Sequence, residues 1–380
     1  MTLLAALPII RGMAGLSFRC AACGREYPLE AASWNCACGG PFELAGGPAF
    51  SRAGLEPGEW SLWRYRAFLP VEERVSLGEG LTPLVALELF GLEAHFKLEF
   101  LMPTGSFKDR GTAVLVSFLK ERGIREVVED SSGNAAASLA AYCARAGIRA
   151  RIFVPSYASP AKLRQIEAYG AELVPVPGSR ADAARAAEAA ARAGSYYASH
   201  YWSPFVLEGL KTFAYELAEQ LGWRAPDNLI FPSGHGTFLL GAYFGFRELA
   251  QAGAISRLPR LFAAQAEACA PLAEGFRLGL AGPAEITPGE TIAEGIRIAR
   301  PVRGPQVLKA IRESAGGVVT VSDAEAEAAQ RELARHGLYV EPTSAVAVAG
   351  LQRLVERGSI RPGELTVVPL TGSGLKGGSG

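Results

Sequence analysis

Three glycine-rich junctions hold polar side chains in an order that suits ligand binding. The first spans residues 103–111 and contains Lys108, the second spans 130–134, and the third spans 232–237. Where a loop enters a helix, backbone N–H groups bind carboxylate or phosphate without a charged side chain. The glycine spacing matches neither a P-loop nor a Rossmann motif. A phosphate on one loop and a carboxylate on another would suit a phosphorylated cofactor with an amino-acid substrate.

Each of these residues also has an ordinary structural interpretation. An isolated lysine such as Lys108 is most often a solvated residue in the first turn of a helix. Ser131, Ser132 and Asn134 are common helix caps or turn residues. The chemical interpretation therefore depends on the three junctions occurring together and in this order.

The segments around the junctions alternate between short β-rich runs and alanine-rich helical runs. Strands are expected at 94–99, 126–129, 150–155, 172–176, 228–231, 261–265 and 366–370. Helices are expected at 107–122, 135–146 and 181–193, and a further helix follows the 150–155 strand and ends at residue 169. This alternation predicts an α/β fold with parallel sheets covered on both faces. Ligands of such folds bind beyond the carboxyl ends of the strands, where the three junctions fall.

Four cysteines are concentrated near the N-terminus, at Cys20, Cys23, Cys36 and Cys38. Two close pairs of thiolates can provide a tetrahedral zinc site, although the second pair has one intervening residue instead of the usual two. Disulfides and free thiols are the alternatives that the spacing leaves open. Cys143 and Cys269 lie in apolar helical contexts and are interpreted as core residues.

Composition excludes several classes of protein. Lys plus Arg and Asp plus Glu are both 38, so the formal net charge is zero, and 49% of the residues are hydrophobic. The chain therefore has no basic excess of the kind that binds nucleic acid or an anionic membrane.

No apolar stretch approaches the roughly 18 residues that span a bilayer. Residues 1–11 form a poor signal peptide because Pro8 interrupts them and no basic leader precedes them. A soluble, cytoplasmic protein is expected.

The order of the motifs resembles the threonine synthase branch of the fold type II pyridoxal-phosphate enzymes. The matching segments are 78–84, 97–99, 103–111, 131–134, 208–212, 293–298, 341–345 and 370–376. The resemblance implies two parallel-sheet α/β domains with a cleft between them and a small N-terminal ribbon that carries the four cysteines. Residues 16–50 would form the ribbon, 51–110 with 210–380 the large cofactor domain, and 111–209 the small domain.

The resemblance also implies roles for individual residues. Lys108 would bind pyridoxal 5'-phosphate covalently and act as the base at the substrate Cα, with Asn134 beside the cofactor ring hydroxyl. Thr371 would meet the pyridine nitrogen with a neutral hydroxyl. The cofactor phosphate would be bound by Gly234, His235, Gly236 and Thr237. The substrate would be bound by Ser131, Ser132, Gly133, Thr104, Lys162 and Lys211. Cys20, Cys23, Cys36 and Cys38 would hold a structural Zn²⁺, as in the ribbon of some family members.

Several segments depart from the family pattern and leave the substrate open. Asp130 stands where a small residue usually precedes the Ser-Ser-Gly-Asn run, and Ser203 replaces the usual asparagine. His235 and Thr237 stand where asparagine and glycine are more common. A substrate phosphate needs Lys, Arg or several N–H donors. Lys162 and Lys211 are candidates, but each could equally be a solvated helix residue.

The leading hypothesis is therefore a threonine synthase that converts O-phosphohomoserine and water to threonine and phosphate, acting as a homodimer. One alternative is a cysteate-synthase-like β-replacement on phosphoserine, and another is a deamination like that of serine/threonine dehydratases. An alternative of a different class is a catalytically silent zinc-ribbon scaffold or sensor.

Overall fold

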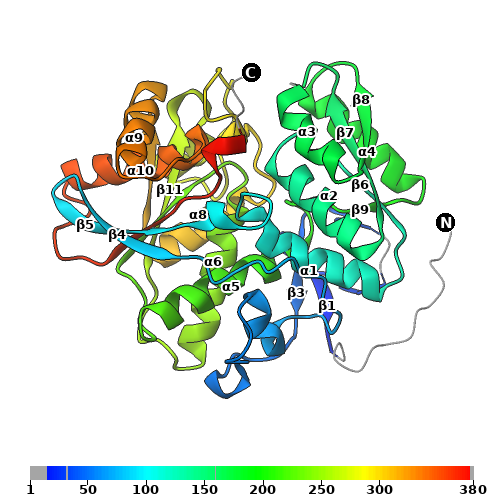
Figure 1. The fold of residues 1–380 in the computed structure, drawn as a ribbon, viewed down its shortest axis with the longest axis horizontal. Helices are drawn as coiled ribbons and strands as arrows, with labels where there is room; N and C mark the ends of the chain where they lie inside the picture. The colour runs from blue at the N-terminus through cyan, green and yellow to red at the C-terminus, as the bar shows by residue number, and fades with distance from the viewer. Residues whose placement is uncertain (1–14, 31–32, 159, 377–380) are drawn as a thin grey trace. The chain divides into compact units, whose positions relative to one another are not determined.

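The computed structural model describes residues 15–30, 33–158 and 160–376, drawn in Figure 1. They divide into two compact units. Unit 1 contains the chain up to Gly80 together with Lys108–Gly209, and unit 2 contains Leu81–Phe107 and Leu210–Lys376. The expected large domain, 51–110 with 210–380, differs from this grouping at residues 51–80 and 108–110, which belong to unit 1. The segment interpreted as a poor signal peptide lies outside the described residues.

Unit 1 is built on a four-stranded parallel sheet of order β8-β7-β6-β9. Its strands are β6 (Glu126–Glu129), β7 (Arg149–Pro155), β8 (Glu172–Val176) and β9 (Tyr196–Tyr197). Its helices are α1 (Lys108–Glu121), α2 (Asn134–Ala146), α3 (Pro160–Ala168) and α4 (Arg180–Arg192), and α5 (Pro204–Gln220) begins in this unit. The expected strands and helices of this part of the chain are confirmed.

The N-terminal part of unit 1 forms a small antiparallel sheet of order β2-β1-β3. Its strands are β1 (Ser17–Cys20), β2 (Glu26–Pro28) and β3 (Phe42–Ala45), and short 3-10 helices η2 (Arg52–Gly54) and η3 (Leu62–Phe68) follow. The segment before residue 81 is fixed to unit 1 by the fully buried Glu79. Its carboxylate accepts 2.7 Å hydrogen bonds from Trp63 Nε1 and from the Tyr142 hydroxyl of α2. These contacts explain why residues 51–80 group with unit 1.

Unit 2 is built on a six-stranded sheet of order β12-β11-β10-β13-β5-β4. Its strands are β4 (Leu84–Leu89), β5 (Leu92–Lys97), β10 (Asn228–Pro232), β11 (Arg260–Ala266), β12 (Gly317–Val321) and β13 (Thr366–Pro369). The helices that begin within unit 2 are α6 (Thr237–Gln251), α7 (Pro271–Arg277), α8 (Gly304–Glu313), α9 (Asp323–Arg335) and α10 (Pro342–Glu356). Short 3-10 turns are η4 (Glu99–Leu101), η5 (Glu267–Cys269), η6 (Glu294–Ile296) and η7 (Gly374–Lys376). Helix α10 packs against β10, β11, β12 and β13 and contributes seven of its 15 residues to the buried core cluster.

The parallel sheet predicted from the alternating pattern is confirmed except at one edge. Strand β4 pairs with β5 in the antiparallel direction. The connecting residues Phe90 and Gly91 have φ values of 56° and 78°. Two consecutive positive φ angles form the turn that closes a two-residue hairpin, so the chain reverses instead of crossing over.

Two further expectations can be compared with the described residues. Cys143 and Cys269 are buried, as predicted for core positions. None of the described helices is long and apolar enough to cross a membrane.

Candidate active site and cysteine cluster

Lys108 is the first residue of α1, and it is half-buried. The loop before it is anchored within unit 2 by several backbone contacts. The Phe107 N–H donates to the Thr371 carbonyl at 3.0 Å, and the Ser373 N–H donates to the Gly105 carbonyl at 3.0 Å. The predicted substrate residue Thr104 is buried, and its carbonyl accepts a 2.6 Å hydrogen bond from Lys376 Nζ. The lysine therefore follows a loop with a well-defined conformation.

The predicted substrate loop, residues 131–134, lies between β6 and α2. Asn134 is the first residue of α2, and the N-cap residue Gly133 offers no side chain to the N–H groups of the first turn. A Cβ atom at Gly133 would meet nothing within 4 Å, so the loop is open on this side. Ser131 is buried, and its hydroxyl accepts from the Gly133 N–H at 3.3 Å. Uncapped N–H groups beside serine hydroxyls fit a substrate carboxylate.

Two adjacent carboxyl groups precede this loop. Tyr197 and Tyr201 donate from their hydroxyls to the Asp130 carboxylate at 2.6 and 3.1 Å. His200 Nδ1 lies 2.8 Å from Glu129 Oε1. Burial raises the pKa of both acids, and the Asp130 charge raises the pKa of Glu129 further, against the attraction of Lys108.

The sequence marked Asp130 only as a departure, and Tyr197 and Tyr201 were not expected to bind it. They come from a different strand and loop, so no local pattern pointed to them. His200 has the bonded partner expected of a structural histidine.

The predicted phosphate loop lies between β10 and α6 in unit 2. Gly236 is the N-cap of α6, with φ of 72°. A Cβ at Gly234 would lie 2.9 Å from the Ile296 Cα, and one at Gly236 would lie 2.6 Å from Val307. His235 is half-buried and Thr237 is buried. The two glycines therefore let the loop pack closely against Ile296 and Val307. The N–H groups at the start of α6 have no side-chain cap, which suits the phosphate of pyridoxal phosphate.

The remaining predicted ligands have different surroundings. Thr371 is buried two residues after the end of β13, with its hydroxyl 2.9 Å from that of Ser344. Lys211 is buried and its Nζ lies 3.1 Å from Glu248 Oε1, so its charge is already paired within unit 2. Lys162 lies in α3, and its side chain is outside the described part of the structure.

Two of the family-like segments form a buried ionic network within unit 2. Lys97 and Glu216 are fully buried and form an ion pair. The N–H groups of Leu81 and Thr82 both donate to the Glu216 carboxylate at 2.8 Å, and the Thr82 hydroxyl donates to Glu99 at 2.7 Å. Segments 78–84 and 97–99 therefore fasten β4 and β5 to α5, a structural role that sequence reasoning missed.

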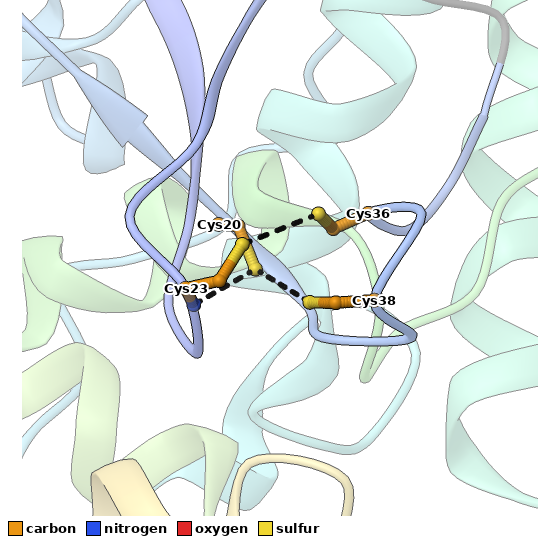
Figure 2. Close-up of side chains that lie close together, drawn as sticks. All are labelled: Cys20, Cys23, Cys36 and Cys38. Carbon is orange, nitrogen blue, oxygen red and sulfur yellow. Dashed lines mark hydrogen bonds between the residues drawn. The ribbon is translucent and has the colours of Figure 1, made fainter.

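The four clustered cysteines converge in the structure (Figure 2), with sulfur atoms all within 4.8 Å of one another. The Cys20 and Cys38 sulfurs are 3.5 Å apart, and those of Cys23 and Cys36 are 3.6 Å apart. Four sulfurs at about 2.3 Å from a tetrahedral Zn²⁺ would be about 3.8 Å apart, so the cluster fits the ion. A Cβ at Gly40 would lie 2.7 Å from the Cys20 sulfur, which explains the glycine after the second pair.

The thiols of this cluster have divergent acidities. The Cys38 N–H and the Tyr27 hydroxyl lower the pKa of Cys36 to about 6. The Gly40 N–H lowers the pKa of Cys38, but the Cys20 and Cys36 sulfurs outweigh it and raise that pKa to about 12. Four crowded sulfurs favour the thiolate form together only when a cation offsets their mutual repulsion.

Comparisons with known proteins agree with this geometry. The chain belongs to the pyridoxal-phosphate dependent enzymes, whose family model matches residues 75–372. Within that family it is similar to threonine synthases. The one from Methanocaldococcus jannaschii is 39% identical over 94% of this chain and 92% of its own length. The one from Methanosarcina acetivorans is 37% identical over 94% and 91%.

Solved structures confirm the fold type II architecture. A threonine deaminase from T.th. superposes with a TM-score of 0.65 at 27% identity, covering 77% of this chain and 92% of its own. A pyridoxal 5'-phosphate-dependent aspartate racemase gives a TM-score of 0.66 at 26% identity, covering 77% and 90%.

Proposed function

We propose that the protein is a threonine synthase, which converts O-phosphohomoserine and water to threonine and phosphate. The observation that carries this proposal is the 37–39% identity to threonine synthases over 94% of the chain. Lys108, residues 131–134, residues 234–237 and Thr371 support it, because they follow the order of the family's site, although His235 and Thr237 differ from its usual residue types.

Each residue of the proposed site has a role that matches its chemistry. Bound pyridoxal phosphate supplies an electron sink for the bond electrons released at the substrate Cα. Lys108 takes the proton from Cα and returns it later in the reaction. Residues 131–133 hold the substrate carboxylate through N–H groups and hydroxyls, and Asn134 contacts the cofactor ring. Residues 234–237 bind the cofactor phosphate, and Thr371 meets the pyridine nitrogen.

The pairing of Lys211 affects the proposal for the substrate phosphate. Its ammonium already faces Glu248, so binding a phosphate would require exchange of that partner. The Thr104 carbonyl accepts a hydrogen bond from Lys376, and Thr104 is proposed as a substrate residue from the family resemblance. Lys162 remains a candidate from its position in α3.

A second candidate function is deamination of a hydroxy-amino acid. The structural similarity to a threonine deaminase at 27% identity favours it, as does Asp130, whose carboxyl stands beside the loop expected to receive an anionic substrate. Both functions use the same cofactor and the same lysine, and they differ in products.

The test is an assay of cofactor-loaded protein with O-phosphohomoserine that follows phosphate and threonine together. Equal release of both supports threonine synthase, whereas ammonia release from serine or threonine without threonine formation supports the deaminase. Lys108→Ala should abolish either activity while the fold persists. Lys120→Ala, on the exposed end of the same helix, is the matched control and should keep wild-type turnover. Near-normal activity of Lys108→Ala would contradict the proposal.

We further propose that the Cys20, Cys23, Cys36 and Cys38 cluster holds Zn²⁺ as a structural ion. The sulfur separations support it, as does the lack of any disulfide among the described residues, where all six cysteines are free. Free thiols also suit the reducing cytoplasm, where we place the protein. A homodimer is proposed from the family resemblance alone, and the mass of the purified protein in solution tests it.

A further inference from the structure

Ser344 lies in the first turn of α10 and is fully buried. Four polar groups surround its hydroxyl. The N–H groups of Thr371 and Gly372 both donate to Ser344 Oγ at 2.9 Å. The Thr371 hydroxyl oxygen lies at 2.9 Å and the Gly372 carbonyl at 3.4 Å.

The hydrogen-bonding capacity of a serine hydroxyl decides the direction of each contact. A hydroxyl has two lone pairs and one proton. The two backbone N–H groups occupy both lone pairs of Ser344. Its proton must therefore go to an oxygen, and the Thr371 hydroxyl at 2.9 Å is a closer acceptor than the Gly372 carbonyl at 3.4 Å.

The orientation of the Thr371 hydroxyl follows from that assignment. Since Ser344 has no lone pair left, the Thr371 proton cannot point back at it. Among the described residues, Ser344 is the one hydrogen-bond partner found for the Thr371 hydroxyl. The Thr371 proton is thus directed away from Ser344 and is available to a ligand.

We propose that Ser344 is a positioning residue that makes Thr371 a hydrogen-bond donor to the pyridine nitrogen of the cofactor. This rests on the proposed contact between Thr371 and that nitrogen. A nitrogen that accepts a hydrogen bond carries no proton. Ser344 therefore keeps the pyridine ring neutral and a weaker electron sink, which suits elimination and replacement at the side chain over transamination.

The direct test is the ¹⁵N chemical shift of the pyridine nitrogen in protein loaded with ¹⁵N-labelled pyridoxal phosphate. The wild-type protein should give the shift of an unprotonated, hydrogen-bonded pyridine. A pyridinium shift at neutral pH overturns the proposal without any variant. This readout does not depend on which reaction the enzyme catalyses, so failure of the threonine synthase proposal is recognised separately by its products.

Variants then distinguish the contribution of Ser344 from that of Thr371. Ser344→Ala should move the ¹⁵N shift toward the pyridinium value and lower kcat about tenfold, with KM changed less than about twofold, as expected for loss of one hydrogen bond. Thr371→Val removes the donor and offers no acceptor, so its ¹⁵N shift should move away from the pyridinium value, to that of an unbonded neutral pyridine. Ser344→Thr keeps a hydroxyl and should restore most of the shift and the rate.

Loss of stability alone must not be mistaken for the proposed effect, because Ser344→Ala leaves two buried N–H groups without a partner. The matched control is Ser314→Ala, since the buried Ser314 hydroxyl also accepts a backbone N–H, that of Leu261 at 3.2 Å. This control should lose stability and keep the ¹⁵N shift. If Ser344→Ala behaves like Ser314→Ala, with an unchanged shift and kcat, then Ser344 is structural only and the proposal is overturned.

Discussion

The fully buried Glu129 and the half-buried Asp130 form an acidic pair before residues 131–134, the proposed substrate loop. Asp130 receives two tyrosine hydroxyls, whereas the second carboxylate oxygen of Glu129 has no hydrogen-bond partner among the described residues. Burial without full pairing disfavours the ionised form, so the pKa of Glu129 lies well above the usual range. The residue therefore stabilises the native state in its neutral form and opposes folding when it ionises.

The sign of the pH dependence follows from linkage. Between the unfolded pKa of about 4.3 and the raised native pKa, the native state binds more protons than the unfolded state. The contribution of Glu129 to the free energy of unfolding of the cofactor-free protein should therefore decline as the pH rises above about 4.3. Glu129→Gln should reduce that decline by on the order of 1 kcal/mol, measured by urea unfolding across pH. The exposed Glu167→Gln serves as control, and a variant as pH-dependent as wild type would refute the argument.

At the scale of elements, the close approach of α1 and α5 explains the glycine of the 208–212 segment. Gly209 lies in α5, and a Cβ atom there would fall 2.1 Å from the Arg110 carbonyl oxygen of α1. Gly111 is similarly close, since its Cβ would lie 2.6 Å from Val206. The glycine of the 208–212 segment is therefore required for packing of two helices within unit 1, independent of any ligand.

Gly209→Ala should accordingly destabilise the protein by about 2–4 kcal/mol, because backbone cannot yield as a side-chain tip would. The measurement is the midpoint of urea unfolding with the cofactor present and absent. Gly58→Ala is the control, because a Cβ there would meet nothing within 4 Å. Equal midpoints for the two variants would show that α1 and α5 can separate without cost.

The elements differ in how readily local sequence predicts them. Alanine-rich helices such as α2 and α4, and buried strands such as β7, were predictable because the composition and periodicity of their own residues indicate the secondary structure. Strand β4 was not predicted. It pairs with β5 through a tight turn, and that turn depends on positive φ angles at Phe90 and Gly91. Strand β12 was missed as well, although its sequence is rich in valine.

The site shows the same division. Lys108 and the three junctions are predicted from residue type and order. Ser344, Tyr197 and Glu216 act through partners far away in the sequence. Such contacts depend on tertiary register, and no spacing within the chain displays them.

At the scale of the whole molecule, the ribbon is packed onto the rest of unit 1 at two aromatic contacts. Phe18 meets Phe205 with centroids 6.2 Å apart, and Trp34 meets Tyr197 edge-on at 5.4 Å. The Arg192 guanidinium also lies over the Trp34 ring, 5.4 Å from its centroid. Tyr197 in turn donates to Asp130, so a chain of contacts links the ribbon to the residue that precedes the proposed substrate loop.

Removal of the metal should therefore weaken more than the ribbon. A chelator should lower the melting temperature of the wild-type protein by several degrees, consistent with a loss of about 1–2 kcal/mol. Cys38→Ser should contain less zinc by atomic spectroscopy and should no longer respond to the chelator. Cys143→Ala, which removes a buried thiol outside the cluster, should keep its zinc. A wild-type protein that contains no zinc and ignores the chelator would exclude the structural ion.

The order of strands in unit 2 has a consequence for synthesis on the ribosome. Strand β13 lies in the middle of the sheet, paired with both β10 and β5, yet it is the last of the described strands to be made. Until residue 366 emerges, the β4–β5 hairpin and the β10–β12 strands each present an unpaired edge. A nascent chain halted before that point would expose both edges to other chains, so this sheet cannot be completed before residues 366–369 have been made.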